Sequence, residues 1–392
     1  MSDLTRRDFV ATTALGVAGL WRGAPALAHD RTHNAELLMY VGTYTEGGRK
    51  DGIYLVRMDS ATGALRKVGA ADGGSNPSFL TIHPDGRTLY AVNEVAVTQG
   101  RGTGSVRAFA IDAASGELTL RNERMSEGTG PCYVSTDLTG EVVLVANYGS
   151  GTVAMLPVQP DGSLVGASQA VKHVGKGPVT SRQEAAHAHC IIPLAGNKFA
   201  IAADLGVDRV LVYRLEIERN MLVHLEPADA ELKPGTGPRH LATHPTLPLV
   251  YVSGELNSTV TLLRVNAATG ALTVGQTLST VPALSTVANY PADIHVSADG
   301  RTCYVSNRGH NSIAVYSIAP NTGALTLRQH VSTGGDWPRN FTIDPTGQWL
   351  LVANQRSGSV VVFARDPMNG QLTATSQRIE LPSPVCLRFQ TA

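Results

Sequence analysis

Short, almost unbroken runs of hydrophobic residues recur along the chain, and most of them end in Asn, Asp, Glu or Arg. Runs of this length that are rich in Val, Leu and Tyr predict buried β-strands rather than amphipathic helices. The runs are LMYVGT from Leu38, TLYAVN from Thr88, VLLVAN from Val143, FAIAAD from Phe199, VYVSGE from Val250, CYVSNR from Cys303 and LLVANQ from Leu350.

Each run belongs to a longer unit that repeats roughly every 50 residues, a period typical of β-propeller blades. A short segment precedes each run except the first, and a turn such as Ala61-Thr62-Gly63-Ala64-Leu65 closes several units. The preceding segments align at Pro77, Pro131, Ala188, Pro238, Ala292, Pro338 and Pro384. A parallel β-helix is the alternative, but its coils are much shorter. We therefore predict four-stranded blades.

The two ends of the repeat predict how the ring closes. The first unit has no segment before its hydrophobic run, whereas SPVCLRF at the C-terminus is such a segment with nothing after it. Both facts fit a C-terminal strand that completes the first blade and so removes open sheet edges. The predicted fold is all-β, a seven-bladed β-propeller over residues 36–392, closed by the C-terminal strand.

The first residues carry the pattern of an export signal. Arg6-Arg7 is followed by a modest apolar run and then by Ala26-Leu27-Ala28, which reads as a cleavage site. A twin-arginine signal peptide over residues 1–28 predicts a periplasmic or secreted protein. The alternative is an ordinary N-terminal helix.

Composition excludes some partners. The chain has 32 basic and 32 acidic residues, so no charge surplus favours nucleic acid or a membrane surface. Its four cysteines are widely spaced within strand-like segments, which predicts buried free thiols. The sequence has no H-E-x-x-H zinc motif, no Gly-rich loop for phosphate or a nicotinamide cofactor, and no G-x-S-x-G motif of serine hydrolases. We therefore expect no metal and no cofactor. We expect a monomer.

Unusual residues gather at one end of the predicted blades. In an antiparallel blade the innermost strand begins where the second strand ends, so both open onto one face around the central channel. This places Arg239 beside Glu255, whereas His240 should alternate to the other side and pack. The candidate set from the inner segments is His187, His189, Arg239, His295 and Arg339, and that from the second-strand ends is Asn147, Asp204, Glu255, Arg308 and Asn354.

Simpler interpretations exist for some of these residues. The side chain of an Asn at a strand end commonly hydrogen-bonds to the backbone of the turn that follows. The repeated Asn residues could therefore have a structural role alone. His295 is equally well explained as a satisfied core histidine. Two arginines, a glutamate and a His-x-His pair from three consecutive blades are harder to explain by packing. Arg binds carboxylate or phosphate, and Glu or His can move a proton.

The chain resembles the seven-bladed propeller lactonase family, which includes bacterial 6-phosphogluconolactonases and the fungal carboxymuconate-lactonizing enzyme. The segments that carry the resemblance are YVGTYTEGGRKDGIYLVRMD, NPSFLTIHPDGRTLYAVNE, AHAHC, GPRHLATHP, SGELNSTV and ADIHVSADGRTCYVSNRGHNSIAVY. It implies catalytic roles for His187 or His189, Arg239, Glu255 and Arg308. Asn147, Asp204, His295, Arg339 and Asn354 remain candidates for substrate binding.

Three functions are compatible with this set. In a hydrolase that opens a sugar-derived lactone, Arg239 and Arg308 would hold an anionic substrate while Glu255 activates water. His187 or His189 would then protonate the leaving hydroxyl. The substrate would be 6-phosphogluconolactone, as the resemblance implies, or a free sugar lactone. A muconate-type lactonizing cycloisomerase and a non-catalytic binding propeller of the cell envelope are the alternatives.

Overall fold

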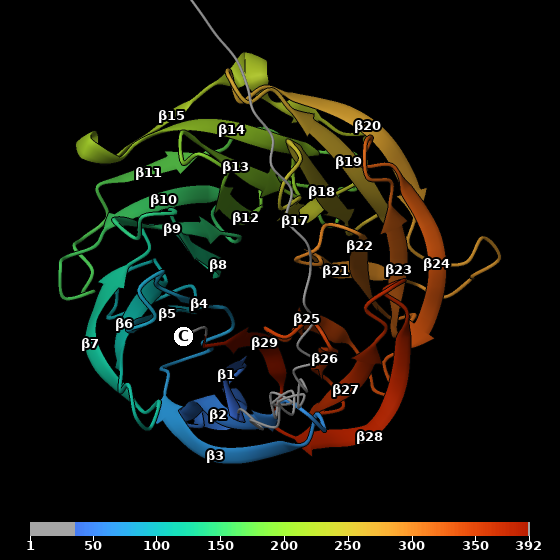
Figure 1. Cartoon of the computed structure of the whole chain (residues 1–392). Helices are drawn as coiled ribbons and strands as arrows, with labels where there is room; N and C mark the ends of the chain where they lie inside the picture. Colours follow the sequence, from blue (N-terminus) through green and yellow to red (C-terminus); the bar gives the residue numbers. More distant parts are fainter. Residues whose placement is uncertain (1–35, 391–392) are drawn as a thin grey trace, which may run out of the picture. The chain divides into compact units, whose positions relative to one another are not determined.

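The computed structural model describes residues 36–390, which form seven antiparallel sheets arranged as blades around a common axis (Figure 1). Within this range there are three short 3-10 helices and no α-helix. The predicted all-β, seven-bladed propeller is therefore confirmed. The predicted signal peptide, residues 1–28, lies outside the described residues and stays a prediction.

The blades follow the chain order, apart from the first. Blade 1 contains β29 (Pro384–Phe389), β1 (Glu36–Thr43), β2 (Asp51–Asp59) and β3 (Leu65–Asp72), with η1 (Glu46–Gly48) between β1 and β2. Blade 2 contains β4 (Leu80–Ile82), β5 (Thr88–Asn93), β6 (Ser105–Ile111) and β7 (Leu118–Met125). Blade 3 contains β8 (Pro131–Thr136), β9 (Val142–Asn147), β10 (Thr152–Pro157) and β11 (Gln169–Lys172).

The fourth blade is the irregular one. It contains β12 (Ala188–Pro193), β13 (Phe199–Asp204), β14 (Arg209–Glu216), β15 (Met221–His224) and a two-residue strand β16 (Ala230–Glu231), with η2 (Ile217–Arg219) and η3 (Glu226–Ala228). Blade 5 contains β17 (Pro238–Thr243), β18 (Leu249–Gly254), β19 (Thr259–Val265) and β20 (Leu272–Ser279). Blade 6 contains β21 (Tyr290–Val296), β22 (Thr302–Arg308), β23 (Ser312–Ile318) and β24 (Leu325–Ser332), and blade 7 contains β25 (Pro338–Ile343), β26 (Trp349–Asn354), β27 (Ser359–Arg365) and β28 (Leu372–Glu380).

The ring closes through the two ends of the described chain, as the sequence predicted. β29 pairs with β1 in antiparallel register, with Val41 opposite Leu387 and Met39 opposite Phe389. The first blade therefore consists of one strand from the C-terminus and three from the N-terminus (Figure 1).

The hydrophobic core lies between neighbouring blades. Second strands such as β9 and β13 are buried along their whole length, because each blade is packed on both faces. This explains why these segments read as continuous hydrophobic runs rather than as alternating ones. Outer strands such as β20 and β28 are largely exposed.

Tyrosines in the second strands of several blades hydrogen-bond to the next blade. The hydroxyl of Tyr40 donates to the carbonyl of Gly116 (2.8 Å), Tyr251 to Gly323 (2.8 Å) and Tyr304 to Gly370 (2.7 Å). The acceptor is in each case the turn glycine of the following blade, where φ lies between 71° and 79°. The Tyr of the hydrophobic run in one blade therefore hydrogen-bonds to the Gly of the closing turn in the next blade.

A β-bulge interrupts most of the inner strands near their beginning. In β17, Pro238 pairs with Gly254 and Leu241 with Val252, so that two residues lie opposite Ser253. The same pairing places Pro291, opposite Asn307, in the position of Pro238. The sequence alignment at Ala292 is therefore wrong by one residue, and Pro291 is the residue that corresponds to Pro238.

All four cysteines, Cys132, Cys190, Cys303 and Cys386, are buried and free, as predicted.

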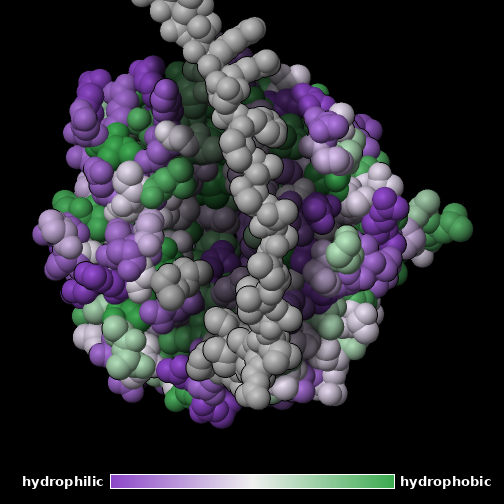
Figure 2. All heavy atoms as spheres, viewed as in Figure 1, coloured by the Kyte–Doolittle hydropathy of each residue, from purple (hydrophilic) through white to green (hydrophobic). Residues whose placement is uncertain are grey.

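On the face of the propeller seen in Figure 2, hydrophilic and hydrophobic residues are intermixed around the ring. In the described part of the chain, no helix is long and apolar enough to cross a bilayer.

Candidate active site

Strand pairing in blade 5 brings Arg239 and Glu255 together. Arg239 is the second residue of β17 and Glu255 directly follows β18, whose last residue pairs with Pro238. The amide of Glu255 donates to the carbonyl of Gly237 (2.8 Å), which fixes the start of the side chain. Arg239 Nε then lies 3.0 Å from Glu255 Oε2.

Three arginines surround the Glu255 carboxylate. Arg308, the last residue of β22, places Nη2 2.7 Å from Oε2, and Arg182 places Nη2 2.6 Å from Oε1. Glu255 and Arg239 are only 3% and 2% exposed, so these charges interact in a poorly screened environment. Burial raises the pKa of Glu255, but the charges of Arg308, Arg239 and Arg182 outweigh it and lower the pKa to about 2.

Arg182 was not among the residues selected from the sequence. It lies in the irregular segment 175–190, and its guanidinium also donates to the hydroxyl of Tyr148 (3.3 Å). The length and irregularity of this segment were the available signal, since long loops often carry function. The side chain of Arg182 is 36% exposed, which places it at the solvent side of the otherwise buried cluster.

The two buried arginines have donors that are not fully used. Arg239 Nε and Arg308 Nη2 lie within ion-pair distance of Glu255, yet neither makes a well-aligned hydrogen bond in the described structure. The guanidinium charges therefore attract the carboxylate without a well-aligned hydrogen bond from these two nitrogens. Buried donors without a well-aligned acceptor are rare in folded proteins.

Arg339 belongs to the same cluster. Its guanidinium carbon lies 5.3 Å from the centre of the Tyr44 ring, and the Tyr44 hydroxyl donates to Glu94 (2.9 Å). Burial lowers the pKa of Arg339, but the nearby Tyr44, Glu94 and Glu255 outweigh it and raise the pKa.

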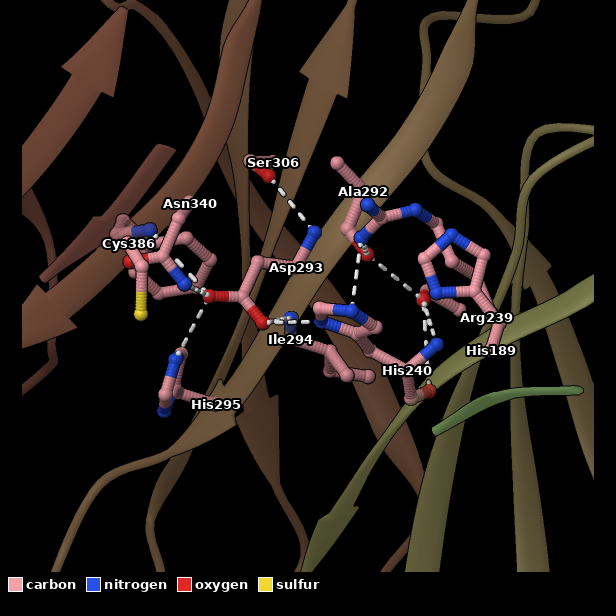
Figure 3. Close-up of polar contacts among 12 residues, drawn as sticks. His189, Arg239, His240, Ala292, Asp293, Ile294, His295, Ser306, Asn340 and Cys386 are labelled. Atoms are coloured by element: carbon pink, nitrogen blue, oxygen red, sulfur yellow. Dashed lines mark hydrogen bonds and ion pairs between the residues drawn. The ribbon is translucent and has the colours of Figure 1, made fainter. Parts of the chain in front are cut away.

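His240 occupies a different place from the one predicted. Its Nδ1 lies 2.7 Å from Asp293 Oδ1, and its Nε2 lies 3.1 Å from Arg239 Nη1 (Figure 3). The expectation that His240 points away from Arg239 is wrong, because the bulge in β17 breaks the alternation of side chains. Burial and the charge of Arg239 lower the pKa of His240 to about 3 despite Asp293, so the imidazole is neutral.

Asp293 links several inner strands. Its carboxylate accepts from His240, from His295 Nε2 (3.0 Å) and from the side-chain amide of Asn340, and lies between these groups in Figure 3. Asn340 in turn accepts from the amide of Leu387 (2.7 Å). His295 is therefore a partner of Asp293, and its side chain is 31% exposed.

The two histidines of the His-x-His pair have different surroundings. His187 stacks on Tyr148 and has both ring nitrogens in contact, Nδ1 with the Tyr148 carbonyl (2.9 Å) and Nε2 with Glu184 (3.1 Å). His189 lies 5.3 Å from the ring of His240 and beside Arg239 in Figure 3. Burial, followed by the charge of Arg239, lowers the pKa of His189 well below its usual value.

The remaining candidates lie at strand ends with their side chains engaged in the fold. Asp204 accepts from the amides of His187 and Gly206 and contacts His173 Nδ1 (2.6 Å). Asn147 donates to the carbonyl of Ser126 and Asn354 to that of Thr333. The structure does not bring these three side chains to Glu255, and their use as substrate ligands remains a prediction.

Hollows on the outside of the propeller do not coincide with this cluster. One of about 640 Å³ is lined by residues such as His244, Asp299 and Arg328, and contains none of the arginines around Glu255. Among the described residues, no group of three or more His, Cys, Asp or Glu side chains is placed to hold a metal ion.

Comparison with known proteins decides the family. Residues 38–389 match the family described as lactonase, 7-bladed beta-propeller. The chain belongs to this lactonase family.

The lactonase is similar to several bacterial proteins over most of its length. It is 39% identical to the 6-phosphogluconolactonase of Bacillus subtilis over 75% of this chain and 81% of that one. It is 34% identical to the 6-phosphogluconolactonase of Formosa agariphila over 75% and 83% of the two chains. The solved structure of the periplasmic gluconolactonase of Pseudomonas aeruginosa matches with a TM-score of 0.85 and 36% identity, over 91% of this chain and 99% of that one.

Proposed function

We propose that this lactonase hydrolyses a sugar-derived lactone that carries negative charge, and that Arg239, Arg308, Arg182 and Arg339 bind it. The observation that carries the proposal is the charge of the cluster. Four guanidiniums lie near three carboxylates, Glu255, Glu94 and Asp293, which leaves at least one positive charge in excess. A buried excess of charge is costly unless a ligand of the opposite sign neutralises it.

The same arginines suit the transition state of lactone opening. Attack of water on the lactone carbonyl gives a tetrahedral intermediate with a negatively charged oxygen. The incompletely used donors Arg239 Nε and Arg308 Nη2 would stabilise this oxygen, and fixed donors in a buried site stabilise such charge strongly. Arg182, which is closer to solvent, would hold the anionic group of the substrate.

We assign the proton transfer to His189 rather than to Glu255. With a pKa of about 2, Glu255 is a weak base as long as the arginines surround it. His189 is a buried neutral imidazole whose pKa is lowered by burial and then by the charge of Arg239. An anionic substrate would offset the charge of the arginines and so raise this pKa. His189 could then take a proton from water and return it to the ring oxygen as the carbon–oxygen bond breaks. Glu255 would hold Arg239 and Arg308 in place. This differs from the sequence-based expectation that Glu255 activates water.

A panel of lactones tests the proposal. Titration of released acid at constant neutral pH, corrected for spontaneous hydrolysis, would compare 6-phosphogluconolactone, gluconolactone and a muconate-type lactone. We expect turnover of a sugar lactone, and a loss of at least 100-fold in kcat/KM in Arg239→Ala and His189→Gln, since removal of one such donor or base has effects of this size.

The variants also separate the possible roles of Glu255. Glu255→Gln keeps the shape of the side chain and removes its charge. If Glu255 only positions the arginines, the variant retains part of its activity with an unchanged pH profile. Unchanged turnover in Arg239→Ala and His189→Gln together would show that the site is elsewhere, and turnover of the muconate-type lactone alone would favour the cycloisomerase.

We infer a periplasmic location and a monomeric state. The location is supported by the twin-arginine pattern in residues 1–28 and by the similarity to a periplasmic gluconolactonase. The monomeric state stays a prediction from the closed ring of blades, in which β29 covers the open edge of β1. Cell fractionation and light scattering test the two points. Activity confined to the cytoplasmic fraction would contradict the location.

A further inference from the structure

The residue before the inner-strand proline has an unusual backbone conformation in most blades. Its φ is positive at Asn76 (52°), Gly130 (60°), Gly237 (58°), Trp337 (66°) and Ser383 (44°). Gly, Asn and small polar residues tolerate this left-handed region, whereas a bulky residue there is an outlier. Trp337 is the large side chain in this series. An outlier of this kind calls for a reason in the function of the residue.

The ring of Trp337 contacts a member of the arginine cluster. The guanidinium carbon of Arg308 lies 5.4 Å from the ring centre, and that of the exposed Arg356 lies 3.4 Å from it. Tyr290 is close to both: its ring lies 5.9 Å from Trp337, and its carbonyl accepts from Arg308 Nε (3.0 Å). Arg308 is thus held on one side by the Tyr290 carbonyl and the Trp337 ring, and on the other by Glu255.

Arg308 needs such support because its surroundings disfavour its charge. Burial, followed by the charges of Arg239 and Arg339, lowers the pKa of Arg308 to about 9, although Glu255 opposes this. The face of an aromatic ring attracts a guanidinium electrostatically. Unlike a carboxylate, it does so without using the N–H groups of the guanidinium as hydrogen-bond donors. The Trp337 ring can therefore hold Arg308 while leaving Nη2 directed to the Glu255 side.

We propose that Trp337 is a positioning residue for lactone opening, whose ring holds the Arg308 guanidinium beside Glu255. The proposal rests on the proposed function, in which Arg308 binds the developing charge of the substrate. This role gives a reason for a Trp side chain at a backbone position whose positive φ suits glycine better.

Replacement of Trp337 by glycine tests the proposal directly. Glycine suits the left-handed backbone, so Trp337→Gly should keep a melting temperature within about 3 °C of the parent protein. It should lower kcat/KM at least tenfold, mainly through kcat. Trp337→Phe, which retains an aromatic ring, should recover activity to within about threefold. Asn220→Gly makes the same kind of change, at a φ of 51°, in the turn between η2 and β15 of blade 4, and should leave activity unchanged.

A double-mutant cycle shows whether Trp337 acts through Arg308. In an Arg308→Ala background, adding Trp337→Gly should change kcat/KM by less than about twofold, because the group that Trp337 holds is already missing. Full activity in Trp337→Gly, or effects that simply multiply in the double variant, would overturn the proposal. Full activity in Arg308→Ala would instead contradict the proposed function, so the two failures are distinguishable.

Discussion

At the scale of single residues, the candidate site depends on how charges are compensated. Glu255 is the common partner of three arginines, and neither its pKa nor their orientation can be understood from one pair alone. The most accessible of these partners is Arg182, which also contacts Tyr148. It is therefore the residue whose removal should disturb ligand binding with the least damage to the buried part of the cluster.

We predict that Arg182→Ala raises KM for an anionic lactone about tenfold and changes kcat less. A tenfold change corresponds to about 1.4 kcal/mol, a modest value for a charge-assisted contact at a half-exposed side chain. Steady-state kinetics with phosphorylated and unphosphorylated lactones measure the effect. Arg219→Ala, at a 69% exposed arginine paired with Glu216, is the matched control and should leave KM unchanged. An equal effect of both variants would contradict a role for Arg182.

His240 makes stability depend on pH. An unfolded histidine takes up a proton below its usual pKa of 6.5, whereas folded His240 does so only near pH 3. Between these values the unfolded state binds more protons, so the free energy of unfolding falls as the pH falls. His240→Gln should reduce this slope by about one proton, or about 1.4 kcal/mol per pH unit. Urea unfolding at a series of pH values measures it, and an unchanged slope would contradict the prediction.

At the scale of strands, the sequence predicted which end of a strand each residue occupies better than it predicted the direction in which its side chain points. The repeat placed Arg239, Glu255 and Arg308 at the same end of their blades, because antiparallel pairing alone determines which strand ends meet. It failed for His240, because the bulge that turns this side chain toward Asp293 leaves no mark in a hydrophobic pattern of period two. It also missed Arg182, since no repeat constrains the conformation of an irregular loop.

The left-handed conformation of Trp337 illustrates the same limit. Asn76, Gly130 and Gly237 are residues from which a positive φ could be predicted, but Trp337 is not. The conformation is imposed by the position in the blade rather than by the residue. Side-chain partners such as Asp293 with Asn340 are likewise set by the packing of neighbouring blades, which sequence alone did not resolve.

Substitution of a buried residue in the closing strand β29 should destabilise the protein as much as a substitution in any other inner strand. Leu387 is fully buried and opposite Val41 in β1. We predict that Leu387→Ala lowers the free energy of unfolding by about 2–5 kcal/mol through loss of buried surface and formation of a cavity. Leu327 on the outer strand β24 is 43% exposed, so Leu327→Ala should cost less than about 1 kcal/mol. Urea midpoints measure both, and equal values would show that β29 is not integral to the fold.

At the scale of the whole molecule, the four cysteines report whether the ring is closed. All are buried, and burial raises the pKa of Cys190 to about 12, so few thiolates are present at neutral pH. We predict slow reaction of the folded protein with a thiol reagent and rapid reaction of all four cysteines in denaturant. Mass spectrometry after brief labelling identifies the sites. Rapid labelling of Cys190 in the folded protein would contradict a closed ring.

The position of Cys386 adds a more specific expectation. This residue lies in β29, where its sulfur contacts the amide of Leu80 in the neighbouring blade. If the ring opens first at the strand contributed by the C-terminus, Cys386 should become reactive at a lower urea concentration than Cys190. Simultaneous labelling would indicate that all blades unfold together.

The pairing of β1 with β29 also has a consequence for the time at which the protein can finish folding. The two strands are separated by roughly 340 residues, which a ribosome takes about 17 to 70 s to synthesise. During that interval the inner edge of β1 has no partner, although the middle blades are already complete. The newly made chain therefore passes through a stage in which an exposed strand edge has to be protected from neighbouring chains, and this stage ends only when β29 has been synthesised.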